Sequence, residues 1–427
     1  MEIFSTKDKY FTKKLDVIIK RGETEPYDVE EKVKIIIRNV KQNGDKSLLK
    51  YTEKFDGAKL TVKGMKVDRN KIKKALKNIS EYDLKILKLA AKRIDAFHRK
   101  ETPKSWQYTE KDRTVLGQKV TPLERVGIYV PGGKAAYPST VLMNAIPAKI
   151  AGVKEIIMAT PPSKNGINPY VLAAADIAGV DAIYQVGGAQ AIAALAYGTE
   201  TILKVDKIVG PGNIYVATAK RLVFGVVDID MIAGPSEILI INDGTGNPSW
   251  IAADLLSQAE HDELASSILL TTSKNMAEAV AKEVSRQIKE LKREAIAKKS
   301  IDRYGAIIIT KDLKEAVDIA NTIAPEHLEL FVKKPFGLFK KIKNAGAIFL
   351  GYNTPEAVGD YMAGPNHTLP TGGTARFSSP LGVYDFIKRS NVILFSRKGL
   401  DKFGADIVRF ADMEGLDAHG KSVAIRI

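Results

Sequence analysis

Two polar residues, Gln258 and His261, lie three positions apart in a stretch whose apolar spacing predicts an amphipathic helix. Residues three apart on a helix project from the same face, so this helix would direct a carboxamide and an imidazole toward one place. Such a pair can bind a metal ion or a polar substrate. The alternative is an ordinary solvated helix, and only convergence with other polar residues distinguishes the two.

The other histidines are candidates for that convergence. Of the five histidines, four stand beside acidic or amide residues at predicted helix ends or in loops: His261, His327, His367 and His419. His98 has no such neighbour and is given no role. Together with carboxylates and amides, these histidines offer nitrogen and oxygen ligands, which suit zinc, manganese or cobalt without selecting among them. Such a site would be open, with substrate completing the coordination.

The adjacent pair Glu326 and His327 suggests a second kind of chemistry. In a loop or at a strand start, the two side chains could flank a reacting centre, one activating water and the other moving protons. The alternative is a surface glutamate beside a core histidine. The chain has no cysteine, which excludes disulfides, thiolate metal sites and a cysteine nucleophile. Serine-hydrolase, zinc-protease and P-loop motifs are also absent from the sequence.

The elements that would position these residues change in character along the chain. Residues up to about 105 are predicted to be helical, with a break at Asn43-Gly44-Asp45 and a long amphipathic helix over 82–100. From Thr121, short apolar strands alternate with helices. Predicted strands are 125–130, 155–159, 181–186, 206–209, 238–241, 267–271, 306–310, 326–332 and 347–351. Strict alternation of this kind predicts an α/β protein with parallel sheets.

Glycine-rich loops follow three of the predicted strands. They are Pro131-Gly132-Gly133-Lys134, Gly187-Gly188 and Gly210-Pro211-Gly212. They would line the carboxyl edge of a parallel sheet, where open α/β sheets bind ligands. None matches the G-x-G-x-x-G dinucleotide pattern, so ordinary strand–helix turns remain an alternative. The long loop from Tyr352 is predicted to be functional, and the tail over 398–427 is too short to be a domain and must dock on something.

Composition limits the class of protein. The chain has 427 residues, enough for about two or three compact domains. Its net charge of +15 comes from lysines scattered among acidic residues, which predicts a solvated surface suited to anionic cofactors rather than to nucleic acid. A basic nucleic-acid-associated protein is the binding-only alternative. The N-terminus lacks a signal-type apolar core and no apolar run reaches about 18 residues, so a cytoplasmic protein without membrane spans is expected.

Eight motifs, in order along the chain, resemble the histidinol dehydrogenase family. They are ERVGIYVPGG at 124–133, VGGAQAIA at 186–193, GPGN at 210–213, AGPSE at 233–237, QAEHD at 258–262, APEHLE at 324–329, GPNHTLPTG at 364–372 and EGLDAH at 414–419. The resemblance implies oxidation of L-histidinol through histidinal to L-histidine, the last steps of histidine biosynthesis, with two NAD reduced in one active site. The alternative is a related metal-dependent NAD alcohol dehydrogenase acting on another amino or sulfonated alcohol.

The resemblance also implies roles for individual residues. A zinc ion that orients substrate would be held by Gln258, His261, Asp360 and His419. His327 would be the base and Glu326 would activate water on the aldehyde, the route left to a chain without cysteine. The residues expected to contact substrate are Ser236, Gln258, His261, His327, Asp360, His367, Glu414 and His419. The residues expected to contact NAD are Tyr129, Gln190 and Asn213.

The fold implied by the resemblance is α/β, with two incomplete Rossmann-like parallel-sheet domains, a helical N-terminal segment and an exchanged C-terminal segment. We expect the N-terminal segment over 1–25, a metal and substrate domain over 26–120 and 237–380, and an NAD-binding domain over 121–236. The tail over 381–427 is expected to dock on the partner subunit of a homodimer. There Glu414, His419 and also His367 would complete the partner's site.

Overall fold

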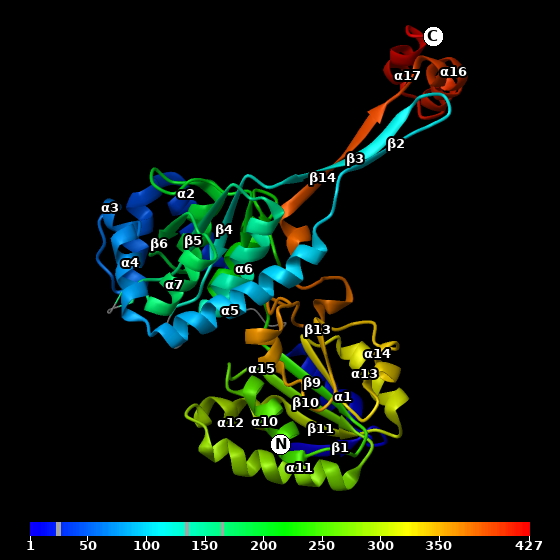
Figure 1. Cartoon of the computed structure of the whole chain (residues 1–427). Helices are drawn as coiled ribbons and strands as arrows, with labels where there is room; N and C mark the ends of the chain where they lie inside the picture. The colour runs from blue at the N-terminus through cyan, green and yellow to red at the C-terminus, as the bar shows by residue number, and fades with distance from the viewer. Residues whose placement is uncertain (23–26, 133–135, 164–165) are drawn as a thin grey trace.

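A computed structural model of the chain describes residues 1–22, 27–132, 136–163 and 166–427. The predicted loop residues Gly133 and Lys134, and the predicted boundary at 25/26, lie outside these residues. The prediction of an α/β protein is confirmed, because the described chain forms two parallel sheets and a small antiparallel one (Figure 1).

One parallel sheet has five strands in the order β6-β5-β4-β7-β8. These strands are β4 Arg125–Tyr129, β5 Glu155–Ala159, β6 Ala182–Tyr184, β7 Lys207–Val209 and β8 Asp228–Ile229. Four of the five were predicted from apolar runs between turn residues. Their side chains are buried on both faces, which explains runs of apolar residues without polar alternation.

Helices cover both faces of this sheet. One face carries α6 Pro138–Ala151 and α7 Pro169–Ile177, with α4 Arg69–Asn78 and α5 Glu81–His98 outside them. The other carries α8 Gly188–Tyr197 and α9 Ile214–Val223, with α2 Tyr27–Asp56 and the short α3 Val62–Met65. The helices of residues 27–98 therefore pack on this sheet, whereas the prediction grouped them with residues 237–380. They do so because the apolar stripe of α2 is buried against α8.

The predicted break in the helical region is present inside α2. Gly44 has φ 48° and ψ −130°, which interrupts the helix. A Cβ at this position would lie 2.1 Å from a carboxylate oxygen of Glu200. The positive φ therefore favours glycine, whereas the Glu200 carboxylate is the end of a flexible side chain that could move aside.

The second parallel sheet has six strands in the order β1-β11-β10-β9-β12-β13. They are β1 Glu2–Ser5, β9 Glu237–Asn242, β10 Ser266–Thr271, β11 Gly305–Ile309, β12 His327–Phe331 and β13 Ala347–Leu350. Helices α10 Pro248–Ala259, α11 Lys274–Gln287 and α12 Glu294–Tyr304 cover one face, and α1 Phe11–Ile19 and α13 Leu313–Ile323 cover the other. The N-terminal segment was predicted to be helical throughout; its first residues instead form β1, because they pair in parallel with β11.

An arm formed by β2 Trp106–Thr109, β3 Val115–Pro122, β14 Ile387–Leu394, α16 Arg397–Met413 and α17 Asp417–Ala424 extends away from both sheets (Figure 1). Its strands pair in the antiparallel order β14-β3-β2. Many of its apolar side chains are exposed, and Ile393 is 71% exposed. The sequence did not predict this sheet.

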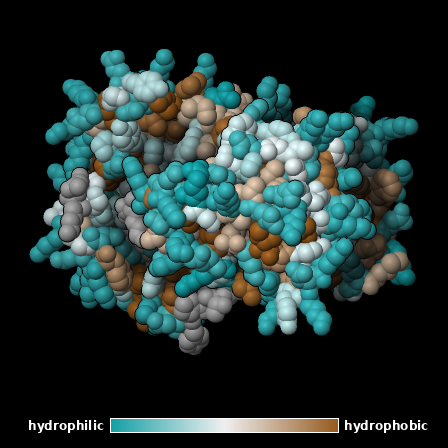
Figure 2. Space-filling model, turned by 90° about the horizontal axis from the view of Figure 1, so that it is seen from below, coloured by the Kyte–Doolittle hydropathy of each residue, from teal (hydrophilic) through white to brown (hydrophobic). Residues whose placement is uncertain are grey.

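Seen from below relative to Figure 1, the surface is predominantly polar. Figure 2 shows a mostly hydrophilic face with scattered hydrophobic patches. Across the described residues, no helix combines the length and the apolar character needed to span a bilayer.

Candidate active site

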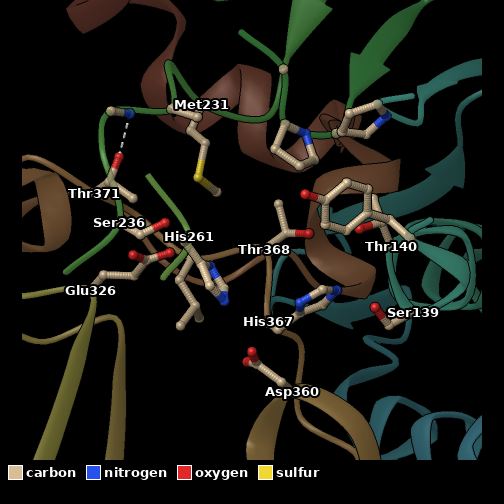
Figure 3. Close-up of a pocket in the computed structure, with 18 of the residues that line it drawn as sticks. Ser139, Thr140, Met231, Ser236, His261, Glu326, Asp360, His367, Thr368 and Thr371 are labelled. Carbon is tan, nitrogen blue, oxygen red and sulfur yellow. Dashed lines mark hydrogen bonds between the residues drawn. The ribbon is translucent and has the colours of Figure 1, made fainter. Parts of the chain in front are cut away.

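A pocket of about 370 Å³ lies between the two parallel sheets (Figure 3). The five-stranded sheet contributes its carboxyl edge through the loop 210–213, which follows β7. The six-stranded sheet contributes its amino edge, because Ser236 precedes β9 and Glu326 precedes β12. The predicted residues that line the pocket are Ser236, Gln258, His261, Glu326, His327, Asp360, His367 and Asn213.

The loop over 210–213 can approach the sheet closely because of Gly210. This residue has φ +109°, and a Cβ on it would lie 2.1 Å from the carbonyl oxygen of Tyr129. Any other residue would push the loop away from β4. Lys220, from α9, donates to the Gly210 carbonyl at 2.9 Å and forms a buried ion pair with Asp230. These two contacts hold the loop against α9.

Gln258 and His261 both reach the pocket, but not from one helical face. The helix α10 ends at Ala259, and His261 lies in the following turn, where its backbone N–H donates to the Gln258 carbonyl at 3.1 Å. The prediction that both residues lie on the helix is therefore wrong for His261. Gln258 is fully buried, while the side chain of His261 is open to the pocket. The turn still directs the imidazole into the pocket beside Ser236 and Glu326 (Figure 3).

Glu326 is held by a reciprocal pair of hydrogen bonds with Glu237. The Glu237 N–H donates to Glu326 Oε2 at 2.9 Å, and the Glu326 N–H donates to Glu237 Oε2 at 3.2 Å. This exchange is possible because β9 and β12 are neighbours in parallel register, with His327 opposite Ile238. Each carboxylate therefore fixes the backbone that carries the other.

Arg21 completes this arrangement from the N-terminal segment. Its Nη2 lies 2.9 Å from Glu237 Oε1, and both side chains are almost fully buried. The same guanidinium donates to the backbone carbonyls of Leu264 and Ile18, at 2.8 and 2.7 Å. A buried, multiply bonded arginine of this kind fixes the geometry of what it touches.

His327 is oriented by its Nδ1, which lies 3.0 Å from the Glu237 carbonyl oxygen and 3.3 Å from Gln258 Nε2. A tautomer with the proton on Nδ1 donates to that carbonyl and leaves Nε2 as the free nitrogen. Nε2 is buried without a hydrogen-bond partner and lies 3.8 Å from carboxylate oxygens of both Glu356 and Asp360.

Burial and charge shift the pKa values of this cluster. Burial raises the pKa of Glu326 to about 7 and that of Glu356 to about 8. Burial alone would lower the pKa of His327, but the carboxylates of Glu356, Glu326 and Asp360 outweigh it and raise the pKa well above its usual value. Burial raises the pKa of Asp360, while the facing imidazoles lower it, with a net downward shift. Groups with perturbed pKa values in a pocket are typical of catalytic sites.

Asp360 and His367 come from the long loop that follows β13. Asp360 lies in a single π-helical turn, Gly359–Ala363, after the short helix α15 Glu356–Val358. Such turns occur frequently at functional sites. His327, Glu356 and Asp360 each offer a ligand atom, and these atoms all lie within 4.8 Å of one another, so this cluster could hold a metal ion. Four buried atoms around the pocket have no partner: Gln258 Oε1, His327 Nε2, Glu356 Oε2 and His367 Nε2.

The residues expected to contact NAD line a neighbouring cavity of about 770 Å³. The Tyr129 hydroxyl accepts from the Gly188 N–H at 3.1 Å, and Asn213 caps α9 by accepting from the Tyr215 and Val216 N–H groups. Gln190 is buried, with Nε2 unpartnered. Asn213 and Pro131 line both cavities, so the two are adjacent.

Glu414 and His419 are the predicted site residues that the chain does not bring to the pocket. Both lie on the arm, where they border an apolar groove with Phe403, Ile407 and Phe410. In Figure 1 this end of the arm lies far from the space between the two sheets. Within one chain, the described pocket thus lacks two of the residues expected at it.

Several buried acids near the site were not predicted to have a role. Asp254 from α10 and Glu329 from β12 form a carboxylate cluster with Glu356, whose N–H donates to Glu329 Oε1 at 2.9 Å. Burial, followed by the charge of Asp254, raises the pKa of Glu329 well above its usual value. An acidic residue inside an apolar run, as in Leu328-Glu329-Leu330, is the signal that could have identified these residues. Glu237, at the start of the apolar strand β9, carries the same signal.

Comparison with known proteins places the chain in a family. A model of the histidinol dehydrogenase family matches residues 19–427. The chain is 58% identical over 427 residues to a histidinol dehydrogenase from Syntrophotalea carbinolica, covering 100% of this chain and 99% of that protein. It is 54% identical to one from Aquifex aeolicus, again covering 100% and 99%.

A solved structure supports the same assignment. The crystal structure of histidinol dehydrogenase from Elizabethkingia anophelis superimposes with a TM-score of 0.94 at 38% identity, covering 100% of this chain and 98% of that chain. Members of the family carry out the final steps of histidine biosynthesis with NAD and zinc. Since the family model and full-length relatives agree, the chain belongs to the histidinol dehydrogenase family.

Proposed function

We propose that this chain oxidises L-histidinol to histidinal and then to L-histidine, reducing two molecules of NAD per substrate. The observation that carries the proposal is the convergence of unpartnered buried atoms, Gln258 Oε1, His327 Nε2 and His367 Nε2, on one pocket. Leaving a buried polar atom without a partner is costly, so such a pocket fits a ligand rich in nitrogen and oxygen. The imidazole and amine of histidinol have this chemistry.

One of these atoms, Gln258 Oε1, also fits a zinc site, together with the His261 and Asp360 side chains that line the same pocket. Gln258, His261 and Asp360 would hold the ion from one chain, and His419 would come from a second copy. These are nitrogen and oxygen donors without sulfur, a set suited to zinc with a position left for substrate. The ion would orient the imidazole and amino nitrogens of the substrate. Ser236 and His367 would contact the substrate directly, as would Glu414 of the second copy.

His327 is the proposed base for alcohol oxidation. With Nδ1–H donated to the Glu237 carbonyl, Nε2 faces the pocket and can take the hydroxyl proton. The carboxylates of Asp360 and Glu356 raise the pKa of His327, and a cation held by Asp360 would offset that effect. The hydride of each step would pass to NAD bound next to Asn213.

Glu326 is the proposed water-activating group for aldehyde oxidation. Its pKa of about 7 allows it to exist as a carboxylate near neutral pH and still accept a proton from water. The deprotonated water would attack the aldehyde carbon. Because the chain has no cysteine, a thiol adduct is not available for this step.

The NAD site is proposed to be the larger cavity, with Tyr129, Gln190 and Asn213 as contacts. Both parallel sheets are proposed to be incomplete Rossmann-like units. Leaving β1 aside, each has five strands in the order 3-2-1-4-5 along the chain, which is the Rossmann order without its last strand. Residues 121–236 would form the NAD unit and 237–380 most of the metal and substrate unit.

The arm is proposed to be exchanged in a homodimer, so that the tail over 381–427 docks on a second copy. An arm with exposed apolar residues such as Ile393, Phe410 and Ile425 is typical of a surface that is buried in an assembly. The exchange would bring Glu414 and His419 to the pocket of the other subunit, whereas His367, which was expected to serve the partner's site, lines the pocket of its own chain. We expect this enzyme of amino-acid biosynthesis to work in the cytoplasm.

The direct test is an assay of purified zinc-loaded protein with limiting histidinol. We expect two NADH to form per histidinol, with histidine as the product. Failure with histidinol, together with turnover of another amino or sulfonated alcohol, would favour the related alcohol dehydrogenase instead. Salt-sensitive gel shifts with generic DNA or RNA would favour a nucleic-acid-binding protein.

A further inference from the structure

Asp56, the last residue of α2, lines the larger cavity with a carboxylate that the chain does not satisfy. Its Oδ2 is buried and has no hydrogen-bond partner. The C-terminal end of a helix carries partial negative charge, which disfavours a carboxylate. Burial also raises the pKa of Asp56 to about 6, so this group is held in an unfavourable setting. A ligand hydroxyl that donates to the carboxylate would relieve it.

An aromatic surface stands next to Asp56 on the same helix. Tyr51 and Phe55 are stacked with ring centroids 5.6 Å apart and planes 8° apart, and both line the cavity. Phe55 is 52% exposed. An exposed ring in a cavity offers a stacking face for a flat base, a contact that any base can make.

The opposite wall of the cavity comes from the carboxyl edge of the five-stranded sheet. It includes Pro161 and Pro162 after β5 and Gly188 at the start of α8. Lys54 also lines the cavity and would favour an anionic ligand, as would Lys32 to a smaller extent, because its ammonium is paired with Asp28. The aromatic ring of Phe55 suits an adenine base, the Asp56 carboxylate suits ribose hydroxyls, and the lysine charge suits a phosphate.

The usual source of a ribose-binding carboxylate is missing from the sheet itself. In dinucleotide-binding folds an acidic residue some twenty positions after the glycine loop accepts from the ribose 2′-hydroxyl, commonly at the end of the second strand. Here β5 is the second strand of the sheet, and the residues after it, TPPSKNGIN at 160–168, include no acid. Asp56 reaches the same edge from a helix outside the sheet.

We propose that Asp56 binds the adenosine ribose of the dinucleotide, accepting its 2′- and 3′-hydroxyls, and thereby selects NAD over NADP. The adenine would lie against Phe55. The 2′-phosphate of NADP would place a like charge beside the carboxylate and remove one hydroxyl donor. This inference rests on the proposed NAD-dependent function, whose NAD contacts line the same cavity.

The test is a titration of the zinc-loaded full-length protein with NADH and NADPH, following nicotinamide fluorescence. Wild-type protein should bind NADH more tightly than NADPH. Asp56→Asn should weaken NADH binding by about tenfold while NADPH binding holds or improves, because a charged hydrogen bond is lost and a repulsion is removed. Glu53→Gln, an exposed change one turn away on α2, removes the same charge and should change neither. Equal losses for both dinucleotides, or no loss, would overturn the proposal.

Two further measurements test which part of the dinucleotide contacts Phe55 and Asp56. Phe55→Ser should weaken both dinucleotides to the same extent and leave their ratio unchanged. Asp56→Asn should weaken 5′-AMP but not nicotinamide mononucleotide; the reverse pattern would place the carboxylate at the other ribose and overturn the assignment. The stoichiometry of histidinol oxidation at saturating NAD is independent of these ratios. A protein that binds NADH as described and fails with histidinol would refute the proposed function alone.

Discussion

Gln258, Glu326 and His327 are buried between packed strands and helices, whereas Glu414 and His419 stand on an arm that extends away from both sheets (Figure 1). In the first group each polar side chain meets another, and Glu237 and Glu326 exchange hydrogen bonds between neighbouring strands. In the second group the two side chains border an exposed apolar groove.

This difference separates two ways of building a site. Parallel strands and the helix α10 fix the first group in position before any ligand binds, so its geometry can be read within one chain. The single chain fixes Glu414 and His419 on the arm but does not bring them to a pocket. Whether they join a site therefore depends on how chains assemble. Changes in the first group and its supporting contacts can therefore alter stability as well as activity, whereas changes in the second should alter assembly and activity.

The largest effect is expected from the proposed metal ligands. Asp360→Ala and His261→Ala should each lower zinc affinity by at least about 100-fold, since even changes outside the ligand shell cost 10- to 100-fold. Activity should fall with zinc content while the circular dichroism spectrum stays native. Metal analysis after dialysis measures the first quantity. Either variant with wild-type zinc content would show that its residue is not a ligand.

The next largest effect concerns Glu326. Glu326→Gln should slow aldehyde oxidation by about 10² to 10⁴-fold and alcohol oxidation much less, because only the aldehyde step needs activated water. Wild-type aldehyde oxidation should fall as the pH drops below about 7, where the Glu326 carboxylate becomes protonated. The variant should lack that limb. Single-turnover rates starting from histidinol and from histidinal distinguish the steps, and equal slowing of both would contradict the role.

A smaller effect, on folding rather than chemistry, is expected at Glu237. Glu237→Gln leaves the buried guanidinium of Arg21 without its carboxylate and should destabilise the chain by about 3–5 kcal/mol. The double variant with Arg21→Met should recover part of that loss, because no buried charge is left unpaired. Urea unfolding at constant zinc gives both values.

An exposed ion pair is the matched control for that experiment. Lys298 and Asp302 lie 2.8 Å apart on the surface of α12. Asp302→Asn should change the free energy of unfolding by less than about 1 kcal/mol. A loss at Glu237 no larger than this would mean that the buried pair does not hold the first group in place.

Much of the fold could be predicted from the sequence, because strands buried on both faces form uninterrupted apolar runs. Apart from short β8, each strand of the five-stranded sheet gave such a signal, and so did β9 to β13. The arm gave none. Residues of β14 such as Lys388 and Arg389 are exposed, and the strand pairs with β3, more than 260 positions earlier in the chain. Neither local hydrophobicity nor a short hairpin turn marks such a strand.

For the site, the sequence predicted which residues take part better than it predicted how they are arranged. The sequence brought Glu326, His327 and Asp360 together only through resemblance, and helical spacing placed His261 on α10 although the helix ends before it. The part played by Glu237 could not be inferred, since its partner Glu326 is 89 positions away. Long-range pairing of strands decides that contact, and no local pattern records it.

The last prediction tests whether the arm supplies the missing half of the site. Chains carrying His419→Ala and chains carrying Gln258→Ala should each be inactive as homodimers, because every site lacks one ligand. If the tail is exchanged, a mixed dimer has one intact site, with Gln258 from one chain and His419 from the other. Random mixing of equal amounts should therefore restore about a quarter of wild-type activity in a symmetric two-site dimer. The control is a mixture of the two variant homodimers under conditions in which subunits do not exchange, and it should stay inactive. Exchange without recovery would mean that His419 completes the pocket of its own chain, which would require the arm to fold back toward it.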